Sequence, residues 1–359
     1  MRVHQMTATL AYGDGVTDYI LEIDRYLRGW GLDSRMYAEH IGEPLSSVGH
    51  YSREYQPFLN ETEDLLIYHH SIYTSNMQLY RQSHNRKVVV YHNITPHKFF
   101  HGYDSGLEAV CRYGRLLLSE FRSCELVLAD SEFNRQELIA AGIPENRTRI
   151  LPISLGVGRF VAAERNATLY AQIKETYPVN LLSVGRVVPN KACEDLIKIL
   201  YMYRKTMNSD AHLWLVGYRV WKRYSNFLEA LVRRLGLEDA VTFTGSVSVA
   251  DLRTYYEASD VFLCASRHEG FGIPLVESMH FDLPVLAYKA TAVPETLGDS
   301  GVLYTRLGYA EVTEMLHLLV TDDELRRRVI ARQRSRLRDF APDRVAIALH
   351  KILEALGIF

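Results

Sequence analysis

Short apolar runs alternate with longer amphipathic stretches along most of the chain. Such runs, rich in branched and aromatic residues, are typical of buried strands. In the first half we expect strands at 3–9, 34–39, 65–70, 87–92, 125–130 and 149–153. Helical periodicity predicts helices near 17–30, 106–123 and 131–141, and Gly142-Ile143-Pro144 ends the third of these.

The same alternation starts again after a polar interval at 161–176. Strands are expected at 179–184, 212–216, 241–244, 260–265, 284–288 and 301–304, and helices at 191–207, 221–236, 249–258, 274–281 and 308–320. Strands alternating with helices predict parallel sheets covered on both faces. The sequence therefore predicts an α/β protein with two doubly wound domains, 1–157 and 158–340, joined by a linker at 155–160. A C-terminal segment, 341–359, begins with Ala341-Pro342 and contains a last helix at 343–357.

Composition narrows the class of protein. A formal charge of -2 on 359 residues gives no bulk attraction to nucleic acid, so no nucleic-acid partner is expected. Four well-separated cysteines form no metal or redox motif. No apolar run reaches the ~18 residues that a membrane-spanning helix needs. We expect a cytoplasmic protein with reduced thiols.

Candidate chemistry lies just after the strands, where open parallel sheets bind ligands. After the first strand, Gly13 and Gly15 allow close backbone approach, and amides near Thr17 could face an anion. A tight turn without a ligand explains the glycines equally, whereas a dinucleotide site is disfavoured because Asp18 replaces its third glycine. His92 ends another strand and could bond a sugar hydroxyl or simply be a loop histidine.

Two cations flank a strand-to-helix turn in "VGRVVPNK". Arg186 and Lys191 would suit a diphosphate, although two solvated surface cations fit the pattern as well. Asn190 is expected to cap the helix that follows.

Two glutamates flank seven uncharged residues in "SRHEGFGIPLVES". Pro274 suits the first turn of a helix, and the glycines before it leave helix amides open to a phosphate. A carboxylate placed only for the helix dipole explains Glu277 but neither Glu269 nor the glycines.

These residues resemble a known family. Glu269 and Glu277 match the E-x7-E motif of retaining glycosyltransferases of family 4 (glycosyltransferase group 1), "VGRVVPNK" is similar to their phosphate-binding segment, and "LPVLAYKATAVPETLGDSGVLY" to their next signature. The resemblance is detailed over 180–305 and looser before it. It implies the GT-B fold, with two Rossmann-like domains facing across a cleft, an N-terminal acceptor domain and a C-terminal donor domain. It also implies that the last helix packs back on the first domain.

The resemblance also implies roles for single residues. Arg186 and Lys191 would bind the donor diphosphate, Glu277 the ribose, and Glu269 the transferred sugar. His92 would contact that sugar near the reacting centre, so His92, Arg186, Lys191 and Glu269 are the expected catalytic residues. The other implied donor contacts are Gly13, Gly15, Val247, Phe271, Gly272 and Ile273.

The implied activity is metal-independent transfer, with retained anomeric configuration, of a hexosyl group. The donor would be a nucleotide-diphosphate sugar and the acceptor a sugar or lipid-linked glycan, in polysaccharide or glycolipid synthesis. No cofactor or metal is expected, and the chain lacks a D-x-D pair. Ser248 and Val249, where guanine-specific relatives place an acid, weakly disfavour GDP-sugars.

Other functions stay open at this point. A non-catalytic sugar-binding protein, an epimerase or a phosphorylase could share the architecture, and a dehydrogenase is more distant. The arginine-rich stretch 323–339 and the arginines of 106–123 are compatible with peripheral contact at the inner membrane surface, although a solvated helix with one buried stripe is the better explanation of the first.

Overall fold

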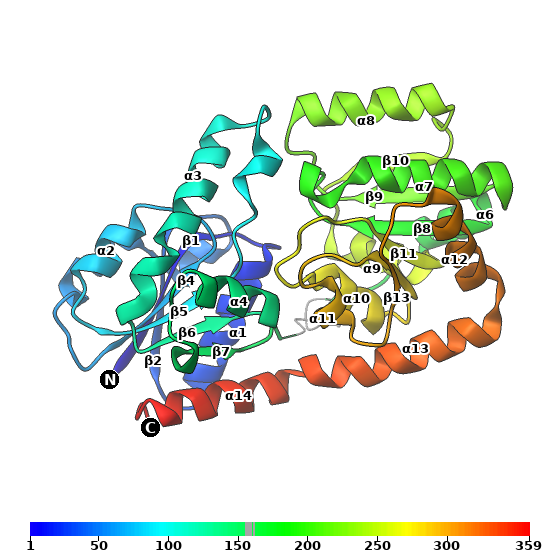
Figure 1. Ribbon diagram of the computed structural model, residues 1–359. Helices are drawn as coiled ribbons and strands as arrows, with labels where there is room; N and C mark the ends of the chain where they lie inside the picture. Colours follow the sequence, from blue (N-terminus) through cyan, green and yellow to red (C-terminus); the bar gives the residue numbers. More distant parts are fainter. Residues whose placement is uncertain (155–159, 161) are drawn as a thin grey trace. The chain divides into compact units, whose positions relative to one another are not determined.

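The computed structural model describes residues 1–154, 160 and 162–359. The chain forms two compact units, one made of Met1–Gly156 with Phe340–Phe359 and the other of Val157–Asp339. Residues 155–159 of the expected linker, and with them the expected boundary at 157/158, lie outside the described residues. Each unit is an α/β domain, so the predicted fold class is confirmed (Figure 1).

The first unit is built on a seven-stranded parallel sheet in the order β3-β2-β1-β4-β5-β6-β7. Its strands are β1 (Arg2–Leu10), β2 (Asp33–Ile41), β3 (Gly49–Tyr51), β4 (Leu65–His70), β5 (Arg86–Tyr91), β6 (Leu126–Ala129) and β7 (Thr148–Ile150). The strand order reverses between β1 and β4, which makes their carboxyl ends the expected place for a ligand.

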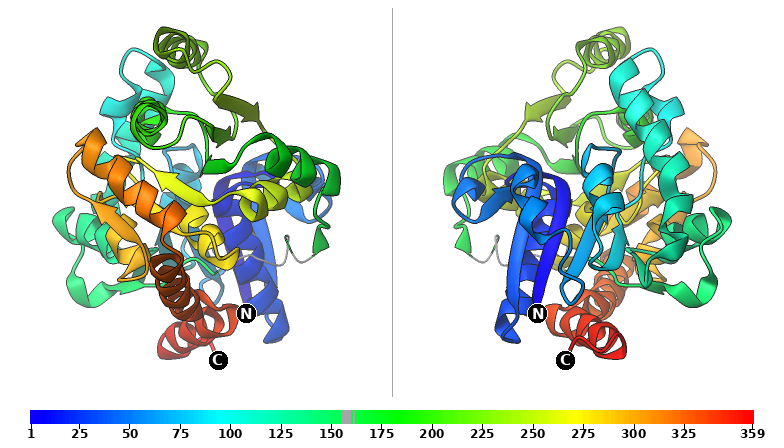
Figure 2. Two further views of the ribbon diagram at one scale, coloured as in Figure 1. Left: turned by 90° about the vertical axis from the view of Figure 1, so that its right-hand side faces the viewer. Right: turned by 90° about the vertical axis from the view of Figure 1, so that its left-hand side faces the viewer.

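Among the described residues, the α-helices that accompany this sheet are α1 (Gly15–Gly29), α2 (Asn76–Gln82), α3 (Ser105–Leu116), α4 (Glu132–Ala140) and α14 (Pro342–Ala355). Helix α1 packs along β1 and β2 (Figure 2). The helix expected to run to residue 123 ends at Leu116 and continues as a 3-10 segment, Leu117–Ser123. Neither β3 nor α2 is predicted from the sequence, because three and seven residues are too few for periodicity to register.

Helix α14 completes the core of the first unit. Its buried Val345, Leu349 and Leu353 belong to one cluster with Val3 of β1 and Leu27 of α1. The hydroxyl of Tyr26 donates to the Pro342 carbonyl at 3.0 Å. The last helix is thus part of the same hydrophobic core as the first strand.

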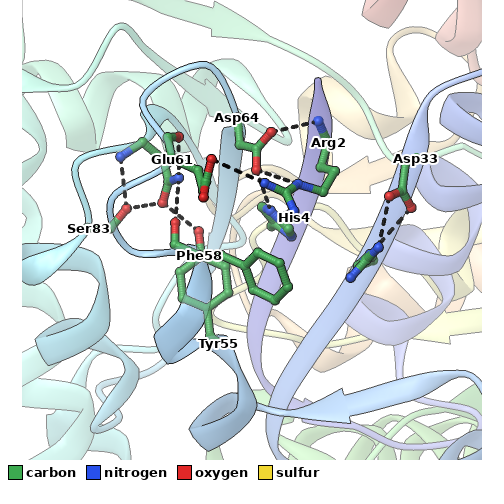
Figure 3. A network of polar contacts seen from close by, with 10 residues as sticks. Arg2, His4, Asp33, Tyr55, Phe58, Glu61, Asp64 and Ser83 are labelled. Carbon is green, nitrogen blue, oxygen red and sulfur yellow. Dashed lines mark hydrogen bonds and ion pairs between the residues drawn. The ribbon is translucent and has the colours of Figure 1, made fainter.

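A polar network holds the amino ends of β1 and β4 together (Figure 3). Asp64 accepts the Arg2 amide at 2.8 Å and the Arg2 side chain at 2.7 Å, and its carboxylate also lies 3.3 Å from the ring of His4. Burial lowers the pKa of His4, and the neighbouring Asp64 offsets this only in part. The network lies at the edge opposite the carboxyl ends, so its role is structural.

The second unit has a six-stranded parallel sheet in the order β10-β9-β8-β11-β12-β13. Its strands are β8 (Val179–Val184), β9 (Ala211–Val216), β10 (Val241–Gly245), β11 (Val261–Cys264), β12 (Val285–Tyr288) and β13 (Val302–Tyr304). The order reverses between β8 and β11, as in other doubly wound sheets. All six strands lie where the sequence predicts them.

The helices of this unit are α6 (Ala167–Thr176), α7 (Cys193–Thr206), α8 (Lys222–Leu235), α9 (Val249–Ala258), α10 (Ile273–His280), α11 (Val293–Leu297), α12 (Tyr309–Thr321) and α13 (Asp323–Leu337). The sequence analysis assigned no helix to the polar interval at 161–176, which contains α6. This helix has only one buried residue, Ile173, so its apolar periodicity is weak.

The arginines of α13 bind the surface of their own unit. Arg334 pairs with Asp282 at 2.6 Å, Arg336 donates to the Glu295 carbonyl at 2.6 Å, and Arg326 to that of Asp260 at 2.6 Å. Among the helices of the described ranges, none is long and apolar enough to cross a membrane.

Candidate functional site

The carboxyl ends of β8 and β11 carry most of the predicted donor site. Arg186 follows β8, and Glu269 follows β11, on either side of the point where the strand order reverses. One pocket there is lined by four of the predicted residues, Arg186, Lys191, Glu269 and Gly272. Val247, Phe271, Ile273 and Glu277 do not line it.

Lys191 and Glu269 form an ion pair in this pocket. Lys191 Nζ lies 2.5 Å from Glu269 Oε1, and the two side chains are 23% and 12% exposed. Arg186 is exposed, and in the described part of the chain no carboxylate lies within ion-pair distance of it. With two cations and one carboxylate, the pocket carries a net positive charge suited to an anionic ligand.

Backbone contacts join the two loops that supply these side chains. The Arg267 amide donates to the Asn190 carbonyl at 2.8 Å, and the Asn190 side chain donates to the His268 carbonyl at 3.3 Å. The expected role of Asn190 as a helix cap is therefore wrong. Helix α7 starts at Cys193 after Ala192 in a left-handed conformation (φ 50°), and the Asn190 amide fastens the loop instead.

Thr291 is a site residue that the sequence analysis missed. Its hydroxyl accepts the Glu269 amide at 2.8 Å and donates to the Glu269 carbonyl at 2.8 Å. Its φ of 48° places it in the left-handed region. Thr291 lies in the "KATAV" turn (289–293) and holds the backbone of Glu269.

The second glutamate of the motif lies inside the unit. Glu277 is 4% exposed and accepts the Tyr256 hydroxyl at 2.7 Å. It belongs to α10, whose first turn has no side-chain cap, because Gly272 (φ 94°) precedes it and Pro274 follows. The Phe271 carbonyl accepts the Thr296 hydroxyl at 2.5 Å, which fixes the turn between the two glutamates.

Gly217, at the end of β9, is a second residue that sequence patterns did not reveal. A Cβ at this position would lie 2.0 Å from the Gly185 carbonyl oxygen. Only glycine permits this approach of two backbones beside Arg186. Nearby, Val247 is partly buried against the core of the unit, and Ser248 caps α9 by accepting the Asp251 amide at 3.1 Å.

Two cysteines line the same pocket, but neither is reactive. Burial raises the pKa of Cys193 to about 12 and also raises that of Cys264. Both thiols stay protonated at neutral pH, so a cysteine nucleophile is excluded here.

In the first unit, Gly13 and Gly15 lie in the turn from β1 to α1. Gly13 has a φ of 79°, with open space beside it, and α1 begins at Gly15. The Asp14 carboxylate accepts the Thr17 amide at 3.1 Å. An internal carboxylate thus caps the Thr17 amide, one of the amides at this helix start that could have faced an anion.

The ring of His92 is buried at the end of β5. Its side chain is 1% exposed, Nδ1 lies 3.1 Å from Asp130, and Nε2 lies 2.9 Å from His69. His70 points the opposite way and contacts the Gly114 carbonyl at 2.9 Å, as alternation along a strand predicts. Asn93, which follows His92, has a φ of 62°, and its side-chain amide donates to Glu137 at 2.8 Å.

A polar groove in the first unit was also not foreseen. It has a volume of about 410 Å³, and its lining includes Glu39, Tyr51, Arg53, Gln56, Asn76 and Gln78. Glu39 is fixed there by the Ser75 hydroxyl at 2.7 Å. Amides, a carboxylate, a guanidinium and an aromatic ring are the groups that bind sugar hydroxyls and sugar faces.

Among the described residues, no three His, Cys, Asp or Glu side chains are grouped so that they could hold a metal ion.

A comparison with known protein families finds a match that lies within the second unit. Residues 171–336 match the family model of glycosyl transferases group 1. O-antigen chain mannosyltransferase B of Escherichia coli is 26% identical over 61% of this chain, and mannosylfructose-phosphate synthase of Agrobacterium fabrum is 29% identical over 53%. The chain spans 58% and 41% of the lengths of these two relatives.

Solved structures match over almost the whole chain. Anabaena HepE in complex with UDP-glucose superposes with a TM-score of 0.75 and 18% identity, covering 99% of this chain and 100% of HepE. Sucrose-phosphate synthase from Thermosynechococcus elongatus gives 0.76 and 17%, with 99% of each chain covered. The two Rossmann-like domains thus have the GT-B fold, and residues 171–336 of the second unit resemble the glycosyl transferases of group 1.

Proposed function

We propose that this protein is a retaining, metal-independent glycosyltransferase that moves a hexosyl group from a nucleotide-diphosphate sugar to a sugar or glycolipid acceptor. The observation that carries the proposal is the pocket between β8 and β11, where Arg186 and Lys191 lie with Glu269 beside a helix start without a side-chain cap. The names of the relatives favour mannosyl or glucosyl as the hexosyl group.

Electrostatics supply the chemistry in this proposal. The leaving diphosphate gains negative charge in the transition state, and a preorganised guanidinium and ammonium lower the free energy of that charge. Lys191 pairs with Glu269 at 2.5 Å, so a bound diphosphate would share the ammonium, and Glu269 would then accept sugar hydroxyls.

Glu277 would bind the ribose, and backbone groups at 271–273 and 247 would complete the donor site. Gly13 and Gly15 would contact the donor from the first unit. His92 would reach it only through its backbone, because its ring is 1% exposed and both ring nitrogens are bonded within the protein. The acceptor would bind the first unit, and its polar groove at Glu39 and Tyr51 is suited to a glycan.

The test is a transfer assay with UDP-, GDP- and ADP-linked glucose and mannose. We expect one donor to be turned over, with the product keeping the anomeric configuration of the donor by NMR. Inversion would contradict the proposed mechanism, and binding of a nucleotide sugar without hydrolysis or transfer would favour a non-catalytic binding protein. A change in NAD(H) absorbance would indicate a dehydrogenase.

Metal independence is tested in the same assay. The proposed mechanism assigns charge neutralisation to Arg186 and Lys191, so turnover in excess EDTA should equal turnover with added magnesium. Complete loss in EDTA, restored by magnesium, would overturn this part of the proposal.

A peripheral membrane contact through α3 is part of the proposal. Tyr113 and Leu116 are 57% and 63% exposed on this helix, and Arg112 is exposed next to Tyr113. Aromatic and apolar side chains beside a cation favour the surface of an anionic bilayer. Co-sedimentation with anionic vesicles at low salt should fall in a Tyr113→Ser/Leu116→Ser variant, and absence of binding by the unaltered protein would refute the contact.

A further inference from the structure

Four neighbouring strands of the first sheet each contribute one residue to a buried polar chain. Gln5 comes from β1 and His69 from β4, while His92 and Asp130 follow the ends of β5 and β6. Gln5 Oε1 lies 3.1 Å from His69 Nε2, His69 Nδ1 lies 2.9 Å from His92 Nε2, and His92 Nδ1 lies 3.1 Å from Asp130 Oδ2. None of the four residues is more than 9% exposed.

Gln5 fixes the direction of the first hydrogen bond. Its amide nitrogen donates to the Ile20 carbonyl at 3.2 Å. If the side-chain amide of Gln5 were rotated by 180°, its oxygen would face the Ile20 carbonyl oxygen and the two would repel. The Gln5 oxygen therefore faces His69, where it can only accept a hydrogen bond. His69 Nε2 must therefore carry a hydrogen.

His69 is neutral and so carries no second hydrogen. Burial holds the pKa of His69 well below its ordinary value, and the adjacent His92 lowers it further. With Nε2 protonated, His69 Nδ1 has a lone pair and accepts from His92 Nε2. His92 Nε2 must then carry a hydrogen too.

The other nitrogen of His92 faces a carboxylate. A lone pair on Nδ1 would repel the ionised oxygen of Asp130 at 3.1 Å, so one proton lies between these atoms. A ring that donates from Nε2 to His69 and from Nδ1 to Asp130 carries both hydrogens, which makes it an imidazolium beside a carboxylate.

We propose that Gln5 and His69 are positioning residues that hold His92 as a doubly protonated imidazolium paired with Asp130. A ring in this state has no lone pair, so His92 acts as a hydrogen-bond donor and never as a general base. The contribution of this state to sugar transfer rests on the proposed function, whereas the protonation state itself does not.

The remaining surroundings are compatible with this state. Tyr19 of α1 meets the rings of His92 and His69 edge-on, with centroid distances of 5.3 and 6.3 Å. Its hydroxyl donates to the Leu151 carbonyl at 3.3 Å, away from the two rings. The rings themselves are nearly parallel, at 8°, which aligns their nitrogens along one line of hydrogen bonds.

The test is NMR of the protein labelled with ¹⁵N-histidine, near pH 7. We expect both nitrogens of His92 to be protonated and His69 to be the neutral Nε2–H tautomer, with assignments made from His92→Asn and His69→Asn variants. A His92 with one unprotonated nitrogen, or a His69 protonated on Nδ1, would overturn the proposal.

Gln5→Met removes the acceptor but keeps the length of the side chain. We expect His69 to change tautomer and His92 to lose its Nε2 hydrogen, whereas Gln333→Met, which alters a fully buried glutamine of the second unit, should leave both signals unchanged. If Gln5→Met does not fold, Asp130→Asn should likewise return His92 to the neutral form. An imidazolium signal that persists in the folded variant would refute the positioning role.

Kinetics test the contribution to transfer separately. With the donor that the protein uses, Gln5→Met should lower kcat about tenfold and leave the donor KM unchanged. This effect is smaller than the roughly hundredfold or more that is typical of removing a proton donor, because only the charge of His92 changes while its ring stays in place. Unchanged kcat would refute that contribution. If the unaltered protein transfers sugar from no donor, the proposed function fails, while the spectra still decide the protonation state.

Discussion

At the scale of single residues, the two glutamates of the E-x7-E motif have different environments. Glu269 is paired with a lysine at the edge of a pocket, and Glu277 is buried against the hydroxyl of Tyr256. Each carboxylate therefore has a protein partner as well as a predicted ligand, and its removal affects both.

Replacement of each glutamate should separate their roles. Glu269→Ala removes the predicted sugar contact, so kcat should fall by at least about a hundredfold, as for the loss of a positioned electrostatic group, with nucleotide affinity changed less than threefold. Glu277→Ala should weaken nucleotide binding about tenfold or more, measured by calorimetry.

Tyr256→Phe is the control for Glu277, because it removes the 2.7 Å hydrogen bond and leaves the carboxylate in place. It should lower the free energy of unfolding by about 1 kcal/mol and keep nucleotide binding. Equal losses of nucleotide affinity in both glutamate variants would contradict the division of roles.

The charged residues of the donor pocket could be predicted from the sequence, but the contacts that hold them in place could not. Arg186, Lys191 and Glu269 follow apolar strands, so their place at one sheet edge follows from the parallel order. Thr291 could not be predicted, since its contact with Glu269 spans 22 residues and a threonine at positive φ has no local signature. His92 was recognised, but its burial depends on partners from three other strands.

At the scale of elements, the chain segments that follow β8 and β9 approach each other more closely than a side chain at Gly217 would allow. The β9 residue pairs run in register with β8 up to Val216, and Gly217 then passes the Gly185 carbonyl. The shape of the Arg186 loop therefore depends on a glycine in the neighbouring strand-to-helix connection.

Gly217→Ala should disrupt this contact. A methyl group 2.0 Å from a backbone oxygen forces both loops apart, and we expect a loss of about 3 kcal/mol or more in unfolding free energy, together with weaker nucleotide binding. Gly236→Ala is the matched control, because it also has positive φ (65°) but open space around it. It should cost about 1–2 kcal/mol and leave binding intact. Equal effects in urea unfolding would show that the contact is unimportant.

Most helices and strands were predictable because their apolar patterns are long enough to repeat. The elements missed, β3, α2, α6 and α11, are short or bury few residues, so tertiary contacts rather than local pattern stabilise them.

Helix α14 offers a test of the first unit's core. Leu349 is 1% exposed and Ile347 is 55% exposed on the same helix. Leu349→Ala should lower the unfolding free energy by about 2–5 kcal/mol through the cavity it leaves, and Ile347→Ala by less than about 0.5 kcal/mol. Similar small effects of both, in urea titrations, would mean that α14 contributes little to the core.

At the scale of the whole molecule, buried histidines make stability depend on pH. Burial lowers the pKa of His70, in the first unit, and of His212, in the second, to about 4. The unfolded chain has ordinary histidines, with pKa values near 6.5, and so takes up protons before the folded protein does.

Stability should therefore be complete above about pH 7 and fall as the pH decreases from about 6.5 toward 4. The lowered pKa of His70 alone corresponds to a loss of about 3 kcal/mol in the free energy of unfolding once the pH is below its pKa in both the folded and the unfolded chain. Urea midpoints measured from pH 8 to pH 5 should decrease, and His70→Asn should flatten this slope. Midpoints that stay constant or rise on acidification would contradict the sign.

The contribution of α14 to the first core also has a consequence for the order of folding. During synthesis, residues 342–355 leave the ribosome only after the whole second unit has been made. Domains fold as units during synthesis, usually from the N-terminus onward. In this protein, all strands and helices of the second unit are synthesised before the first unit is complete. The first unit, although translated earlier, keeps an open apolar surface until its last helix has been made.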